Sequence, residues 1–129
     1  MAEFNYKQII YAGMVAIAGV DGTVDKTERN LVDKVFDHDF NMSRSERKEV
    51  IRMWEGNKEG FTDQIIAELA LFPKFDQREA FKRISQFILF KSNMYNKSMR
   101  KFGKGVDAEK DQINRYRERA DIIRKGLSF

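Results

Sequence analysis

The chain has 129 residues, a length at which one domain buries a substantial core. Apolar residues make up 42% of it and cysteine is absent, which excludes a disordered chain, disulfide staples and thiolate metal sites. The formal net charge is +4, and Lys and Arg are in clear excess over Asp and Glu in residues 97–125. One proline and eight glycines favour helices over a turn-rich sheet. We therefore expect a single all-α domain spanning residues 1–129.

The N-terminal segment predicts a buried helix rather than a leader or a membrane span. Its apolar run from Ile9 to Val20 is shorter than the roughly 18 residues that indicate a spanning helix. No basic leader precedes this run. We expect a cytoplasmic protein, either free or peripheral at the inner face of the membrane.

Apolar spacing and capping residues predict the first three helices. The first covers about residues 3–18. The second begins at Asp25 and carries an apolar face at residues 31, 32, 35 and 36. The third begins at Ser43, whose partner Glu46 three residues later makes a capping box, and it ends at Gly56 and Asn57.

Three further helices complete the predicted fold. The fourth covers about residues 62–72 and stops before Pro73, which cannot continue a helix. Asp76 with Glu79 predicts a capping box that opens the long fifth helix, which extends to about Phe102 and is expected to bury Met94 on its inner face. The sixth covers about residues 107–125. No segment alternates convincingly at period two, so we expect a compact bundle of six to seven helices and no strand.

A faint internal repeat accompanies these elements. The segments GTVDKTERNL (residues 22–31) and GKGVDAEKDQI (residues 103–113) both place Gly, then Val-Asp, before a charged helix start. A duplication of this kind would give a pseudo-twofold bundle.

The segment VDGTVDKTE (residues 20–28) resembles the second half of a calcium-binding loop. With Gly22 at the sixth position of an EF-hand loop, Asp25 falls at the ninth and Glu28 at the twelfth. The first position is then Ile17, which offers no oxygen ligand, so the segment is not an EF-hand.

Two interpretations of the same carboxylates stay open. In the structural one, Asp21-Gly22 makes a turn, and Asp25 with Glu28 caps the following helix. In the functional one, Asp21, Asp25 and Glu28 supply part of a Ca²⁺ or Mg²⁺ site that waters or another segment complete.

The segment AGVDGTVDKTERNLV (residues 18–32), preceded by an apolar helix, resembles the signature of the tellurite-resistance TerB-like family. Asp21, Gly22, Val24 and Glu28 match its motif in order. The resemblance implies an all-helical module of a stress response, whose acidic clusters bind divalent metal. Similar domains precede the J-domain of a membrane-anchored co-chaperone. The second acidic motif of the family is missing here, and Asp107, Glu109 and Asp111 are the candidates to replace it.

No residue pattern indicates an enzyme. The only histidine, His38, lies between Asp37 and Asp39 near a predicted helix end, where a protonated imidazole suits the helix dipole. A ligand or general-base role for His38 is the alternative. Nucleophile and nucleotide-binding motifs are absent from the sequence.

The basic C-terminal region supports a rival function. Five of its cations could bind nucleic-acid phosphates or an anionic membrane surface, namely Arg100, Lys101, Lys104, Arg115 and Arg119. A solvated, charge-balanced helix face explains the same residues, and few aromatic residues accompany them to stack on bases.

The fifth helix carries more apolar residues than one stripe requires: Phe81, Phe87, Phe90, Met94, Tyr95, Met99 and Phe102. We expect either a central helix buried on several sides or a partner-binding or homodimer surface at Phe90 and Met99. The sequence as a whole predicts a non-enzymatic stress-response module that binds a protein partner, with a divalent cation at the acidic loop.

Overall fold

The computed structural model describes residues 4–102 and 107–129, which form six α-helices and no strand. The helices are α1 (Tyr6–Ala18), α2 (Lys26–Asp39), α3 (Arg44–Gly56), α4 (Phe61–Leu69), α5 (Lys74–Phe102) and α6 (Asp107–Lys125). The all-α prediction is confirmed.

Helix α1 is the centre of the bundle. Every residue from Gln8 to Ala18 is buried, and α1 contacts each of the other five helices. A helix that is apolar all round needs such an environment, which explains why its sequence lacks a polar face. Among the described residues, no helix is both long and apolar enough to cross a membrane.

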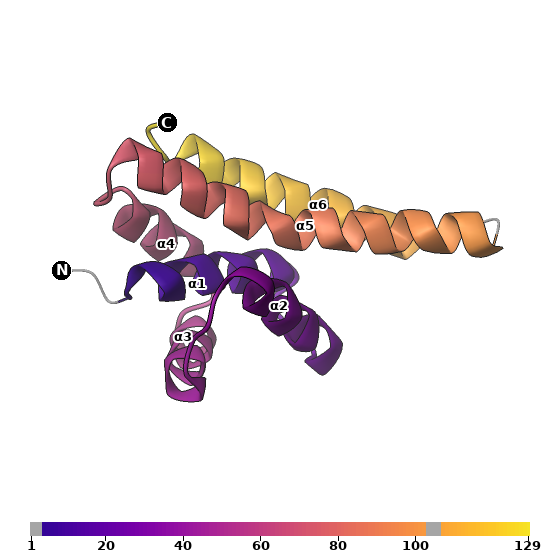
Figure 1. The fold of residues 1–129 in the computed structure, drawn as a ribbon, viewed down its shortest axis with the longest axis horizontal. Helices are drawn as coiled ribbons and strands as arrows, with labels where there is room; N and C mark the ends of the chain where they lie inside the picture. Colours follow the sequence, from indigo (N-terminus) through magenta and orange to yellow (C-terminus); the bar gives the residue numbers. More distant parts are fainter. Residues whose placement is uncertain (1–3, 103–106) are drawn as a thin grey trace.

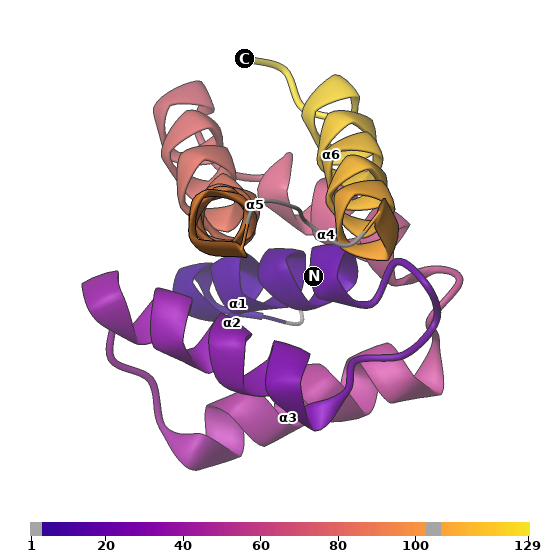
Figure 2. The same cartoon turned by 90° about the vertical axis from the view of Figure 1, so that its right-hand side faces the viewer.

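The helices are arranged in layers around α1. Helices α5 and α6 pack side by side on one side of it, while α2 and α3 lie on the opposite side (Figures 1 and 2). Helix α4 packs against both α1 and α6. The far half of the α5–α6 pair extends beyond the other four helices (Figure 1).

Capping boxes set three of the helix starts. Asp25 and Ser43 are the N-caps of α2 and α3, as predicted, and each pairs with the glutamate three residues later. Helix α1 begins at Tyr6, later than predicted, because Asn5 and Gln8 form a third capping box there.

The predicted capping box at Asp76 and Glu79 is wrong. Helix α5 already begins at Lys74, and the amide of Gln77 donates a 3.0 Å hydrogen bond to the carbonyl of Pro73. Asp76 therefore lies inside the first turn, where its carboxylate suits the positive end of the helix dipole. Helix α4 also ends earlier than predicted, at Leu69.

The burial of side chains along α5 depends on which helices pack against each part of it. Ile84, Phe87 and Ile88 are buried beneath the bundle, whereas the side chain of Met94 is 49% exposed and was predicted to be inward. Met94 belongs to the C-terminal half of α5, and that half of the helix extends beyond the first four helices (Figure 1), so fewer helices are present to cover it. Part of the second internal repeat, residues 103–106, lies outside the described residues.

Candidate functional site

The Asp-Gly segment forms a tight turn between α1 and α2. Gly22 has φ +90°, a conformation that favours glycine, and its amide donates a 2.8 Å hydrogen bond to the carbonyl of Gly19. The carbonyl of Gly22 accepts a 2.8 Å hydrogen bond from Nζ of Lys58. The turn that the sequence predicts is therefore present.

Glu28, which follows this turn, is buried and fully engaged. Its amide donates a 2.8 Å hydrogen bond to Oδ1 of Asp25, and its Oε1 accepts the amide of Asp25 at 3.4 Å. Its Oε2 accepts a 2.7 Å hydrogen bond from the hydroxyl of Tyr116 and a 3.4 Å one from Nε2 of Gln112. Burial raises the pKa of Glu28, although the hydrogen bonds from Tyr116 and the amide of Asp25 oppose the rise.

Asp21, the third predicted ligand, forms an ion pair with Arg115 of α6. Asp25 serves as the N-cap of α2. Within the part of the chain that the structure describes, no group of three His, Cys, Asp or Glu side chains is arranged to hold a metal ion. The metal site at Asp21, Asp25 and Glu28 stays a prediction, and a cation there would have to replace contacts that these carboxylates already make.

His38 lies at the last turn of α2 with its side chain 85% exposed. Its Nδ1 is 3.3 Å from Oδ1 of Asp39. The last turn of a helix is the negative end of its dipole, and the ligand or general-base role of His38 stays a prediction.

The C-terminal cations are distributed over different contacts. Arg115 pairs with Asp21, and the half-buried Arg119 donates from Nη1 to Oγ1 of Thr62 at 2.6 Å. Arg100 and Lys101 are exposed near the end of α5, and Lys104 lies outside the described residues. Two of the five cations assigned to the rival function are thus engaged with the protein itself.

The expected apolar surface of α5 is present only in part. Leu89 is 54% exposed and Met99 is 37% exposed, whereas Phe90 is half-buried, with Nζ of Lys34 5.4 Å from its ring centre. Nothing in the structure identifies what would cover Leu89 and Met99.

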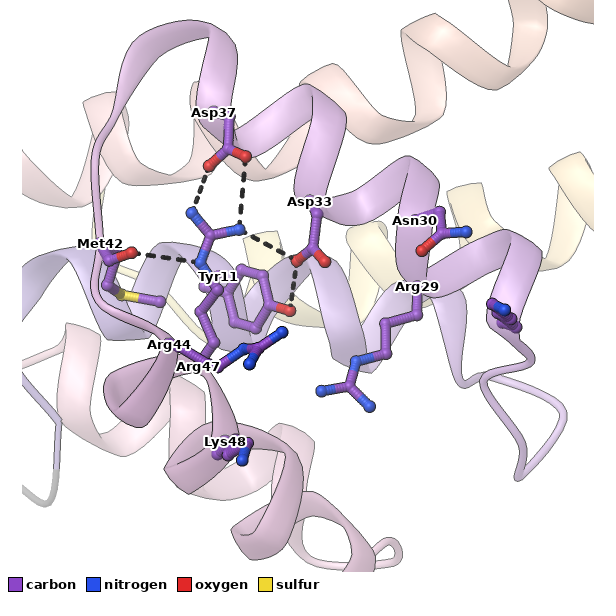
Figure 3. A pocket seen from close by; sticks show the side chains of 10 residues that line it. Tyr11, Arg29, Asn30, Asp33, Asp37, Met42, Arg44, Arg47 and Lys48 are labelled. Atoms are coloured by element: carbon purple, nitrogen blue, oxygen red, sulfur yellow. Dashed lines mark hydrogen bonds and ion pairs between the residues drawn. The ribbon is translucent and has the colours of Figure 1, made fainter.

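A wide groove that the sequence did not predict lies between α2 and α3 (Figure 3). We call it the α2–α3 groove; its volume is about 780 Å³. Ten residues line it: Tyr11, Lys26, Arg29, Asn30, Asp33, Asp37, Met42, Arg44, Arg47 and Lys48.

Arg47 organises the floor of the α2–α3 groove. Its Nη1 donates to Oδ1 of Asp33 at 3.2 Å, its Nη2 pairs with Asp37, and its Nε donates to the carbonyl of Met42 at 3.3 Å. The hydroxyl of the buried Tyr11 donates a 2.7 Å hydrogen bond to the same oxygen of Asp33. Burial and the Asp33 carboxylate raise the pKa of Tyr11, so its hydroxyl stays protonated and keeps donating.

The rims of the α2–α3 groove carry cations without partners. Lys26 and Arg29 lie on α2, and Arg44 and Lys48 lie on α3; all four are exposed. None of their side chains makes a hydrogen bond or ion pair to a described residue. Figure 3 shows Arg29 and Arg44 reaching into the same opening below Tyr11 and Asp33.

The sequence contains a signal for this groove. Its α2 wall uses residues 26, 29, 30, 33 and 37, and its α3 wall uses residues 44, 47 and 48, so each set follows the three-to-four spacing of one helix face. The facing of the two walls depends on how α2 and α3 pack, which no local pattern reveals.

No family model, curated protein or solved structure matches the chain.

Proposed function

We propose that the protein is a non-enzymatic helical module that holds a segment of a protein partner in the α2–α3 groove. The observation that carries this proposal is the combination of two features in one groove. Its floor is held by hydrogen bonds of Arg47 and Tyr11 to Asp33, and its rims carry cationic side chains without partners among the described residues. The contacts of Arg47 and Tyr11 fix the floor before any partner arrives, which lowers the entropic cost of binding.

The groove suits a binding site better than a catalytic one. Its lining residues include no Ser, Thr, Cys or His, so a hydroxyl or thiol nucleophile activated by an imidazole base is missing from it. The Tyr11 hydroxyl is committed to Asp33. Six of the ten lining residues are exposed, and this open form fits an extended segment rather than an enclosed small molecule.

The biological setting rests on the family resemblance. The TerB-like signature ends in the first turns of α2, the helix that also forms one wall of the groove. This continuity supports a stress-response role for the module. The rival, a basic adaptor for nucleic acid or an anionic membrane, has less support because Arg115 and Arg119 are engaged with Asp21 and Thr62.

A peptide library displayed on phage and selected against the full chain tests the proposal. We expect selected peptides to shift the backbone amide resonances of residues 26–37 and 44–48 in NMR spectra. Asn30→Trp, which fills the groove from α2, should abolish binding. Asn96→Trp on the exposed surface of α5 is the matched control and should leave binding unchanged. Peptides that bind elsewhere and ignore Asn30→Trp would refute the proposal.

A further inference from the structure

We infer that the α2–α3 groove recognises a carboxylate-rich segment, in which acidic residues alternate with small polar ones. This inference rests on the proposed function and adds the chemistry of the partner.

The charge balance of the groove is positive and locally uncompensated. Five cations and two carboxylates line it, giving a formal charge of +3. Asp33 and Asp37 both pair with Arg47, so these three residues together keep a net charge of −1, while the four rim cations supply +4. The four rim cations have no such partner among the described residues, so an incoming anion gains their attraction without displacing an internal acid.

The spacing of the rim cations fits an extended chain. Lys26 and Arg29 are about one helical turn apart on α2. Arg44 and Lys48 have a similar spacing on α3. The two members of each pair are therefore roughly 5 Å apart along the helix axis. In an extended peptide, side chains two residues apart point the same way at a distance of roughly 6.6 Å. Alternating acidic residues therefore meet successive cations. Arg29 and Arg44 can each bind a carboxylate through two parallel hydrogen bonds.

Two features of the groove disfavour the binding of a nucleic acid. Asp33 and Asp37 face the same hollow and repel a continuous phosphate backbone that passes them. The only aromatic lining residue, Tyr11, is 0% exposed and offers no ring face on which a base could stack. A segment that carries a few discrete carboxylates avoids both problems.

The length of the groove determines how long a peptide probe has to be. The α2 wall from Lys26 to Asp37 is roughly 16 Å long, which an extended peptide covers with about five residues. A fluorescein-labelled peptide of about eight residues that alternates Glu and Ser is long enough. The same peptide with Gln in place of Glu isolates the contribution of the carboxylates.

Fluorescence anisotropy with the full chain measures the effect. We expect the Glu peptide to bind at least tenfold more tightly than the Gln peptide and to weaken as salt concentration rises. The double variant Arg29→Glu/Arg44→Glu should lose at least tenfold in affinity. The control Arg78→Glu/Lys82→Glu changes the net charge equally, at exposed positions of α5 without a recorded partner, and should stay within about twofold of the parent.

Several results would overturn the inference. The Glu peptide could show no saturable binding at millimolar concentration, or the Gln peptide could bind as tightly as the Glu peptide. The control variant could lose as much affinity for the Glu peptide as Arg29→Glu/Arg44→Glu does. A single-stranded oligonucleotide of the same charge could bind the groove more tightly than the Glu peptide. Neutral display peptides that sit in the groove and respond to Asn30→Trp would refute the acidic partner and leave the proposed function standing. If no selected peptide responds to Asn30→Trp, both proposals fail.

Discussion

The hydroxyl of Tyr116 on α6 donates a 2.7 Å hydrogen bond to Glu28, a residue 88 positions earlier that also completes the capping box of α2. Beside it, Arg115 pairs with Asp21 of the preceding turn. These contacts tie the start of α2 to α6. The acidic segment and part of the basic C-terminal region, which the sequence suggests as two separate candidate sites, are therefore in contact in the fold.

Tyr116→Phe tests the importance of this connection. The substitution removes the strongest donor to Oε2 of the buried Glu28, so we expect the free energy of unfolding to fall by about 1–3 kcal/mol. Urea unfolding followed by circular dichroism measures the loss. Tyr95→Phe on α5, where the ring is half-buried and no hydroxyl partner is recorded, is the control and should cost much less. Equal losses in both variants would mean that the Glu28 contact contributes nothing specific.

Glu28 also predicts a pH dependence of stability. Because its pKa is raised in the folded state, chiefly by burial, the native protein binds more protons than the unfolded chain above the ordinary Glu pKa of 4.5. The contribution of Glu28 is thus fully present below that pH and is lost as pH rises through the raised value.

Unfolding at a series of pH values in Glu28→Gln and in the parent protein checks this sign. We expect the stability of Glu28→Gln to improve relative to the parent as pH rises above about 4.5. Glu59→Gln at an exposed position is the control and should run parallel to the parent. An opposite trend in Glu28→Gln would show that its hydrogen bonds outweigh its burial.

The local signals in the sequence predict much of the fold. Asp25 and Ser43 start their helices as expected because a capping box depends only on residues three positions apart. The same rule fails at Asp76, since Pro73 already supports an earlier start. The predicted burial of Met94 is wrong for a different reason, because it depends on which helices pack against that part of α5.

The candidate sites depend more strongly on tertiary structure. The cap role of Asp25 and Glu28 is visible in the sequence, but the bond from Tyr116 joins segments that only the folded chain brings together. The cations of the α2–α3 groove have helical spacing on each wall. No local pattern indicates that Arg47 would pair with Asp33 and leave the side chains of Arg29 and Arg44 free.

Arg47→Ala should destabilise the floor of the α2–α3 groove. It leaves Asp33 with Tyr11 alone and removes a donor from the carbonyl of Met42, so we expect a loss of about 1–3 kcal/mol in urea unfolding. Arg47→Lys should recover only part of this, because an ammonium group cannot match the planar fork of donors. Arg52→Ala is the control: its side chain is 72% exposed, so the loss should stay below about 1 kcal/mol. Full recovery in Arg47→Lys would show that charge alone suffices.

The predicted cation site can be tested through Arg115, which competes for Asp21. If Ca²⁺ or Mg²⁺ binds Asp21, Asp25 and Glu28, the ion has to displace the guanidinium of Arg115. Arg115→Gln should then bind the ion several-fold more tightly than the parent, because the competing positive charge is gone. Titration of chelator-treated protein, followed by backbone amide NMR, measures both affinities at residues 20–28. Arg117→Gln is the control: it removes an exposed arginine that bonds to Ser92 and not to Asp21, and it should leave the affinity unchanged. If millimolar ion moves none of these amides in either protein, the three carboxylates act as turn, cap and ion-pair residues only.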